Sequence, residues 1–306
     1  MNAIEMTGLY KQFTGKRKTK VDALKGLDLT IAAGEVFGFL GPNGAGKSTT
    51  IKLVMGLLRP TSGTARIMGM DASQAESRRH VGFLPENPAF YDYLSAEEYL
   101  SFVCAQYKMD VMLSHNRSEE VLHRLDLWEA RKRPMRGYSK GMVQRVGLAQ
   151  ALVHDPEVYI LDEPMSGLDP IGRALVKDII LDLRKSGKCV FFSTHITDDV
   201  EKVCDRVGVI VKGSLVAVDR VENILKSGVE GYVIHLRTPE TESLSFAGIE
   251  ALRRTNSVSE FYVPCSTFNG FMGEVNNTGT EVVLVETRRR DLEDFFLALV
   301  NSDSGT

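Results

Sequence analysis

Eight consecutive residues have the types and spacing of a loop that binds nucleotide phosphates. The segment reads Gly41-Pro42-Asn43-Gly44-Ala45-Gly46-Lys47-Ser48 and fits the pattern G-x-x-x-x-G-K-[ST] at every position. Its glycines let the backbone turn several N–H groups toward one anion. Lys47 can reach the outer phosphates, and the Ser48 hydroxyl can hold Mg²⁺. The segment therefore predicts a nucleoside triphosphate site.

The segments on both sides of this loop are of the kind that would position it. The apolar run from Val36 to Leu40 is typical of a buried strand, and a helix is expected from Thr49 to Met55. The N-terminus of that helix adds a partial positive charge where the phosphates would bind. A glycine-rich turn with a chance lysine is the alternative, and the strand-loop-helix setting disfavours it.

A second apolar segment ends in two carboxylates, and it reads Val158-Tyr159-Ile160-Leu161-Asp162-Glu163. At the C-terminal end of a neighbouring parallel strand, Asp162 can help to hold the metal. Glu163 can take a proton from an attacking water, which would allow hydrolysis as well as binding. An acidic pair that merely ends a strand before the turn at Pro164 is the alternative, and the loop upstream argues against it.

Composition sets limits on the class of protein. With 306 residues, 43% of them hydrophobic, the chain can form one large domain and a smaller one. The net charge of −3, from 37 basic and 40 acidic residues, gives no footprint for nucleic acid, so nucleic acid is not an expected partner. We find no signal peptide and no uncharged stretch of about 18 apolar residues, so we expect the chain not to span a membrane by itself. Four widely spaced cysteines indicate free thiols in a reducing cytosol.

The order of strands and helices predicts an α/β fold with a mostly parallel sheet covered on both faces. Antiparallel strands are expected before residue 40, as a flap on the nucleotide core. A helical insertion follows the loop, and Ser95 with Glu98 forms a capping box at its start. Helices at 143–153 and 175–183 and a strand at 189–192 complete the pattern.

The pattern changes near residue 229, where we place a domain boundary. Strands are expected at 232–237 and 281–285, a helix from Ala247 to Arg254, and an amphipathic helix near the C-terminus. We therefore expect a nucleotide-binding domain over 1–228, with a helical subdomain at about 87–140, and a small α+β accessory domain over 229–306.

Two further segments bring polar residues to the edge where parallel sheets bind ligands. Ser139 and Gly141 precede the helix expected from Val143, and a serine and a glycine there form an anion-binding corner. The alternative for Ser139 is an ordinary helix N-cap. His195 follows the strand from Val190 to Ser193 and can act at this edge, with a structural histidine as the alternative.

Taken in order, these segments resemble the ATP-binding cassette (ABC) ATPases over about residues 3–225. The series is the phosphate loop, the helical insertion, the Ser-x-Gly helix start, the Asp-Glu strand, Ser166-Gly167-Leu168-Asp169 and Ser193-Thr194-His195. The sequence from Phe39 to Gly46 and from Tyr138 to Met142 is most similar to that of the ABC-2-type subfamily, which energises bacterial exporters with separate membrane subunits. The segment Leu292-Glu293-Asp294-Phe295-Phe296 is similar to the closing helix of that subfamily.

The resemblance implies an ATPase whose cofactors are ATP and Mg²⁺. Glu163 would polarise the attacking water, and His195 and Lys47 would act with it on the γ-phosphate. Ser48 and Asp162 would hold the metal, and Glu86 stands where the family carries a coupling glutamine, with a carboxylate that can also contact Mg²⁺. Phe13 would stack on the adenine in place of a more usual tyrosine. The expected nucleotide-binding residues are Phe13, Gly41, Pro42, Asn43, Gly44, Ala45, Gly46, Lys47, Ser48, Thr49, Ser139, Gly141 and Asp169.

The same resemblance implies partners. Two copies would pair head to tail, so that Ser139 and Gly141 contact the nucleotide of the opposite copy and Asp169 links the two sites. Integral membrane transporter subunits would receive the motion through the helical insertion and the segment from Glu86 to Tyr93. The expected location is the cytoplasm, on the inner face of the cell membrane. A soluble ABC-type switch in translation or DNA repair is the alternative, but such proteins carry two cassettes or a long coiled coil, and neither is found here.

Overall fold

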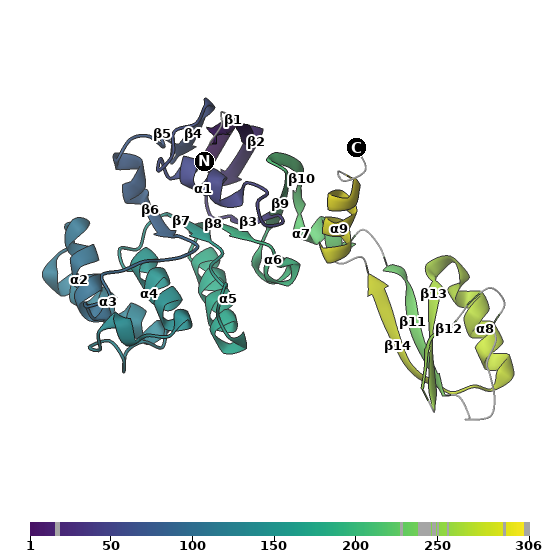
Figure 1. Ribbon diagram of the computed structural model, residues 1–306. Helices are drawn as coiled ribbons and strands as arrows, with labels where there is room; N and C mark the ends of the chain where they lie inside the picture. Colours follow the sequence, from purple (N-terminus) through teal and green to yellow (C-terminus); the bar gives the residue numbers. More distant parts are fainter. Residues whose placement is uncertain are drawn as a thin grey trace. The chain divides into compact units, whose positions relative to one another are not determined.

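The computed structural model describes residues 1–15, 19–226, 229–237, 251–255, 257–289 and 292–302, together with Phe246 and Ile249. The chain forms two compact units, residues 1–221 with 299–306 and residues 222–298 (Figure 1). The domain boundary between residues 228 and 229 stays a prediction.

The larger unit is built on a six-stranded sheet in the order β10-β9-β3-β8-β7-β6. Its strands are β3 (Val36–Leu40), β6 (Val81–Leu84), β7 (Val158–Asp162), β8 (Cys189–Thr194), β9 (Arg206–Val211) and β10 (Ser214–Arg220). All neighbours pair in parallel except β10, which runs antiparallel to β9. Every residue of β3, β7 and β8 is buried, as expected of a parallel sheet covered on both faces. The α/β prediction is confirmed.

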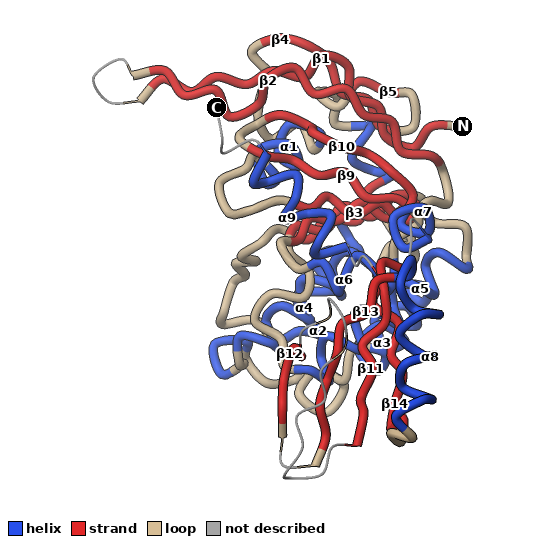
Figure 2. The backbone as a smooth tube through the Cα atoms, turned by 90° about the vertical axis from the view of Figure 1, so that its right-hand side faces the viewer, coloured by secondary structure: helices blue, strands red, loops and turns tan. Residues whose placement is uncertain are grey.

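A second, antiparallel sheet lies against this core in the order β2-β1-β4-β5. It contains β1 (Asn2–Thr14), β2 (Lys20–Ala32), β4 (Ser62–Ile67) and β5 (Met70–Asp71). Its apolar side chains share one buried cluster with Phe39 of β3, Phe191 of β8 and Ile51 of α1 (Lys47–Val54). Figure 2 shows the two sheets as neighbouring layers. This burial fixes the position of the loop between β3 and α1.

Helices surround the parallel sheet of the larger unit (Figure 1). Between β6 and β7 lie α2 (Ala96–Gln106), α3 (Val111–Arg124) and α4 (Lys140–Leu152), and α5 (Pro170–Lys185) and α6 (Thr197–Val203) follow. The capping box is confirmed, because Glu98 N donates to Ser95 Oγ at 3.3 Å and Ser95 N donates to Glu98 Oε2 at 2.8 Å. Short helices of this unit include η2 (Glu76–His80) and η3 (Met135–Gly137), and α7 (Val221–Lys226) begins at Val221, where the first stretch of this unit ends.

The smaller unit is an antiparallel sheet in the order β12-β13-β11-β14. Its strands are β11 (Val229–Arg237), β12 (Ala251–Arg254), β13 (Val258–Pro264) and β14 (Val282–Arg289), and η4 (Cys265–Thr267) and α8 (Phe268–Thr278) lie between β13 and β14. The helix α9 (Leu292–Ser302) begins in this unit, and its residues from Leu299 on are grouped with the larger unit. Phe271 and Val275 of α8 pack on Ile234 and Phe261 of the sheet. Across the described residues, no helix combines the length and the apolar character needed to cross a membrane.

One expected helix of the smaller unit is wrong. The segment from Ala247 to Arg254 was expected to be helical, but its last four residues form β12 and pair with β13. Cross-strand hydrogen bonding outweighs the helix propensity of alanine, leucine and arginine at this sheet edge. Residues 247, 248 and 250 lie outside the described part of the chain.

Candidate functional site

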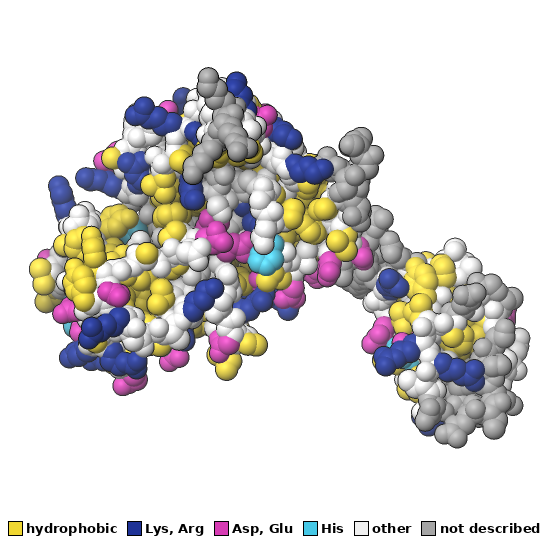
Figure 3. All heavy atoms as spheres, in the orientation of Figure 1, with side chains coloured by type: hydrophobic (Ala, Val, Ile, Leu, Met, Phe, Trp, Pro, Cys, Tyr) yellow, Lys and Arg dark blue, Asp and Glu magenta, His cyan; other side chains and the backbone are white. Residues whose placement is uncertain are grey.

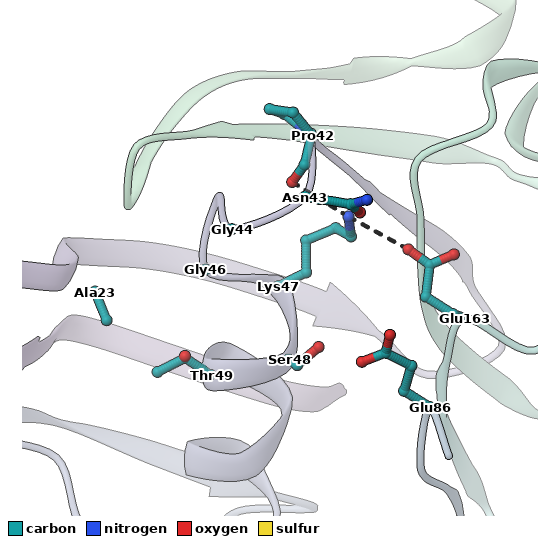
Figure 4. A pocket seen from close by; sticks show the side chains of 10 residues that line it. All are labelled: Ala23, Pro42, Asn43, Gly44, Gly46, Lys47, Ser48, Thr49, Glu86 and Glu163. Carbon is teal, nitrogen blue, oxygen red and sulfur yellow. Dashed lines mark hydrogen bonds and ion pairs between the residues drawn. The ribbon is translucent and has the colours of Figure 1, made fainter.

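The loop between β3 and α1 forms one wall of a cavity of about 270 Å³ (Figure 4). Gly46 has a φ of 114°, which L side chains rarely adopt, and a Cβ there would lie 2.7 Å from the carbonyl oxygen of Ala23. The first turn of α1 carries no acidic side chain, so its N-terminal N–H groups keep their partial positive charge. The cavity is lined by Ala23, Pro42, Asn43, Gly44, Gly46, Lys47, Ser48, Thr49, Glu86 and Glu163.

Lys47 points from the start of α1 toward the carboxyl end of β7 (Figure 4). Its Nζ donates to the carbonyl oxygen of Gly41 at 2.6 Å and lies 3.3 Å from Oε1 of Glu163. Both side chains of this ion pair are almost fully buried, at 6% and 9% exposed. The phosphate loop and the acidic strand, which the sequence predicts separately, therefore meet at one point.

Both the main chain and the carboxylate of Glu163 make hydrogen bonds, although the backbone conformation of this residue is unfavourable. Its φ is 50°, a left-handed conformation that costs a non-glycine residue roughly 1–3 kcal/mol unless its surroundings hold it. Its N–H donates to Ser193 Oγ at 3.0 Å, and its carbonyl oxygen accepts from Gln144 Nε2 at 3.3 Å. Nδ1 of His195 lies 3.1 Å from each carboxylate oxygen. The carboxylate is thereby fixed beside Lys47, where it could accept a proton from a water.

Asp162, the last residue of β7, contacts Ser48 at the end of the phosphate loop. Its Oδ1 accepts from Ser193 Oγ at 2.6 Å and from Ser48 Oγ at 3.3 Å. Burial raises the pKa of this carboxyl, although the hydrogen bonds from Ser193 and Ser48 act in the opposite direction. Ser193 thus touches both members of the acidic pair.

The residues around Ser48 fit a magnesium ion that also binds phosphate. The hydroxyl of Ser48 and the carboxylate of Asp162 are hard oxygen donors, the kind that Mg²⁺ prefers. The side chain of Glu86 points toward Ser48 from the other side of the cavity (Figure 4). Within the described ranges, no group of three or more His, Cys, Asp or Glu residues is arranged to hold a metal. Phosphate oxygens and water would supply further ligands to such an ion.

One face of the larger unit carries a group of acidic side chains. In the space-filling view, acidic side chains gather next to a histidine near the centre of this face (Figure 3). Such a concentration of negative charge favours a cation or a ligand that brings one.

Six of the expected nucleotide-binding residues do not line the cavity. Phe13 of β1 is 40% exposed, with Lys11 Nζ 5.1 Å from its ring centre. Ser139 is the exposed N-cap of α4, its Oγ accepts from the N–H of Met142 at 3.2 Å, and Gly141 follows it. Asp169 is the exposed N-cap of α5 and accepts from the N–H of Gly172 at 2.9 Å. Gly41 and Ala45 also do not line it; a Cβ on Gly41 would lie 2.5 Å from the carbonyl oxygen of Ile210.

Two residues of the site were not predicted to act there. Ser193 belongs to a segment that the sequence singles out, but its contacts depend on the register that pairs Asp162 with Ser193 across β7 and β8. Gln144 is 5% exposed and donates to the carbonyl oxygens of Glu163 and Pro164, each at 3.3 Å. A buried glutamine on a helix carries no local signal for such a contact.

Comparisons with known proteins agree with this geometry. Residues 24–166 match the family model described as ABC transporter. An uncharacterized ABC transporter ATP-binding protein of Nostoc sp. is 38% identical over 288 residues, which cover 91% of this chain and 83% of the relative. The daunorubicin/doxorubicin resistance ATP-binding protein DrrA of Streptomyces peucetius is 36% identical over 243 residues, 79% of this chain and 72% of the relative. A solved ATP binding subunit of an ABC transporter has a TM-score of 0.67 at 29% identity, covering 72% of this chain and 91% of its own.

Proposed function

Because the chain belongs to the ATP-binding proteins of ABC transporters, we propose that it is the ATP-hydrolysing subunit that drives separate membrane-spanning subunits. Members of this family bind ATP and hydrolyse it, and the resemblance seen in the sequence is confirmed. The single observation that carries the proposal is the buried ion pair of Lys47 with Glu163 in the cavity beside the phosphate loop, with His195 Nδ1 3.1 Å from the Glu163 carboxylate.

The proposed chemistry follows from these positions. The backbone N–H groups of the loop and Lys47 bind the β- and γ-phosphates. Glu163 orients a water for attack on the γ-phosphate and takes its proton, while His195 holds the Glu163 carboxylate and reaches toward the γ-phosphate. Ser48 and Asp162, with Glu86 nearby, would hold Mg²⁺, which when bound neutralises charge on the phosphate oxygens.

We propose that two copies pair head to tail. Ser139 and Lys140 are exposed at the N-terminus of α4 and do not line the cavity of their own chain. A helix N-terminus with a serine and a glycine suits an anion, so Ser139 and Gly141 would bind the triphosphate of the opposite copy. Asp169, exposed at the start of α5, would then lie between the two sites. Phe13, exposed on β1, would stack on the adenine.

The membrane partner and the direction of transport are part of the same proposal. A solved relative is described as a subunit of an ABC transporter, which supports separate membrane subunits here. The relative from Streptomyces peucetius is named as a resistance protein, and a transporter confers resistance when it carries a compound outward. We propose an exporter subunit on the inner face of the cell membrane, with residues 229–306 as its accessory domain.

The proposal is tested by purifying the tagged chain from its native membranes in mild detergent. We expect a polytopic membrane protein at a fixed stoichiometry, and ATP hydrolysis by the complex that the Lys47→Ala variant lacks. Recovery of the chain without any membrane protein, or bound to ribosomes or DNA, would contradict the transporter assignment.

A further inference from the structure

The main chain of Glu163 is clamped from two sides. Its left-handed backbone is one that a glutamate rarely adopts, so it depends on the groups that hold it. Ser193 on β8 accepts the N–H of Glu163, and Gln144 on α4 donates to the carbonyl oxygens of Glu163 and Pro164. Both clamping side chains are buried, at 0% and 5% exposed. One clamp belongs to the rigid sheet, and the other belongs to a helix.

That helix has a second feature at its exposed end. Ser139 caps α4, and Gln144 lies five residues further along, a rise of roughly 7.5 Å at 1.5 Å per residue. The two side chains are therefore carried by one rigid element, with Ser139 facing solvent and Gln144 facing Glu163.

The middle of α4 is closely packed against its surroundings. Gly147, in the middle of the helix, lies so near β6 that a Cβ there would be 2.5 Å from Leu84 Cδ1 and 3.2 Å from Pro88 Cβ. The aliphatic part of the Lys140 side chain lies over Gly167, where a Cβ would be 2.8 Å from Lys140 Cε. The part of α4 from Gln144 to Gly147 is therefore closely packed, and packed interiors transmit displacement.

We propose that Gln144 is a positioning residue that transmits the position of α4 to Glu163 of the same chain. Nucleotide held by Ser139 and Gly141 across the dimer would set the position of the helix, and Gln144 would set the main chain of Glu163 accordingly. Each chain would then align its own general base only when its α4 engages the nucleotide of the opposite copy. This inference rests on the head-to-tail dimer proposed above.

A double-mutant cycle on the full chain tests the inference. Gln144→Leu removes both amide hydrogen bonds at nearly the same volume, and Ser139→Ala removes the contact across the dimer. Each change alone should lower kcat about tenfold. The double variant should also lose only about tenfold, because both changes break the same proposed link from the bound nucleotide through α4 to Glu163. Losses that multiply to about a hundredfold, or a Gln144→Leu variant with wild-type kcat, would overturn the proposal.

The matched control is Gln150→Leu, the same change on the same helix. Gln150 accepts from the Tyr99 hydroxyl of α2 and does not touch Glu163. The Gln150→Leu change should leave kcat within about twofold of wild type and should leave the effect of Ser139→Ala unchanged. A purely structural role for Gln144 would lower thermal stability and nucleotide affinity together, so both are measured. We expect the affinity of Gln144→Leu for a fluorescent ATP analogue to stay within about twofold of wild type.

Two further outcomes keep the test decisive. If Gln144→Leu does not fold, the cycle is repeated with Gln144→Asn, which keeps an amide one methylene short, and the same non-additivity is expected with a smaller loss. If the wild-type protein hydrolyses no ATP, the proposed function is wrong. If the wild-type protein hydrolyses ATP but the losses in the double-mutant cycle are additive, only the proposed role of Gln144 is wrong.

Discussion

Lys47 and Glu163 form a buried ion pair, with 3.3 Å between Nζ and Oε1, at the point where the phosphate loop meets the carboxyl end of β7. The same ammonium also donates to the carbonyl oxygen of Gly41. A triphosphate bound in the loop would bring several negative oxygens to Lys47 and compete with Glu163 for it. Binding of ATP would thus free the Glu163 carboxylate to act on a water, which links substrate binding to the readiness of the base.

Lys47→Ala should weaken ATP binding by about 100-fold or more, because it removes a buried cation that would face the outer phosphates. Titration with a fluorescent ATP analogue measures this affinity. Lys52→Ala is the control, since Lys52 lies exposed on the same helix and does not line the cavity. Equal affinities for the Lys47→Ala and Lys52→Ala variants would refute the assignment of the phosphate loop.

His195→Ala should lower kcat by about 100-fold while nucleotide affinity changes by about threefold at most. The imidazole contacts both oxygens of Glu163, so its loss releases the carboxylate from the position in which it would activate a water. His80→Ala is a matched control, because His80 Nδ1 also lies 3.1 Å from a glutamate, Oε2 of Glu157, away from the cavity. If both variants keep wild-type phosphate release, His195 has no role in the reaction.

Glu86→Gln should raise the Mg²⁺ concentration that gives half-maximal ATPase activity by about threefold, with little change in kcat at saturating Mg²⁺. The substitution removes a negative charge that faces Ser48 across the cavity and introduces the glutamine that the sequence resemblance implies at this position. Glu76→Gln, a change of an exposed glutamate on η2, serves as the control. Superimposable Mg²⁺ curves for wild type and Glu86→Gln would show that the carboxylate does not assist the metal.

His154 should make the larger unit sensitive to acid. Burial lowers the pKa of this histidine from 6.5 to about 4, so below pH 6.5 the unfolded chain binds a proton that the folded chain does not. Stability should therefore fall as the pH drops from 6.5 toward 4, by about 1–2 kcal/mol between about pH 7 and pH 5. The ring of His154 stacks on that of Tyr107 with 3.7 Å between their centres, and His154→Phe keeps a ring there. The substitution should remove the part of the stability loss at low pH that His154 causes. Urea unfolding followed by circular dichroism at the two pH values measures the difference, and equal acid losses in both proteins would contradict the assignment.

The phosphate loop could be predicted because its requirements are local. A buried strand, positive φ angles at Gly44 and Gly46 and a helix that begins at Lys47 leave their marks within a few residues. The acidic pair at the end of β7 is similarly readable, since a buried parallel strand is a continuous apolar run.

The contacts that complete the site could not be predicted, because they depend on register and packing between distant elements. Ser193 reaches Asp162 only through the pairing of β7 with β8, and Gln144 reaches Glu163 only through the way α4 lies against that edge. The strand β12 was missed for a related reason, because its conformation is set by its neighbour β13 and not by its own residues.

Phosphate release by Glu163→Gln, measured beside wild type, tests the central claim most directly. The control is Glu157→Gln, the same change in an exposed residue just before the opposite end of the same strand. If Glu163 activates the attacking water, its amide should bind ATP with unchanged affinity and lower kcat by about 100-fold or more, whereas Glu157→Gln should match wild type. A Glu163→Gln variant that keeps most of the wild-type turnover would contradict the account.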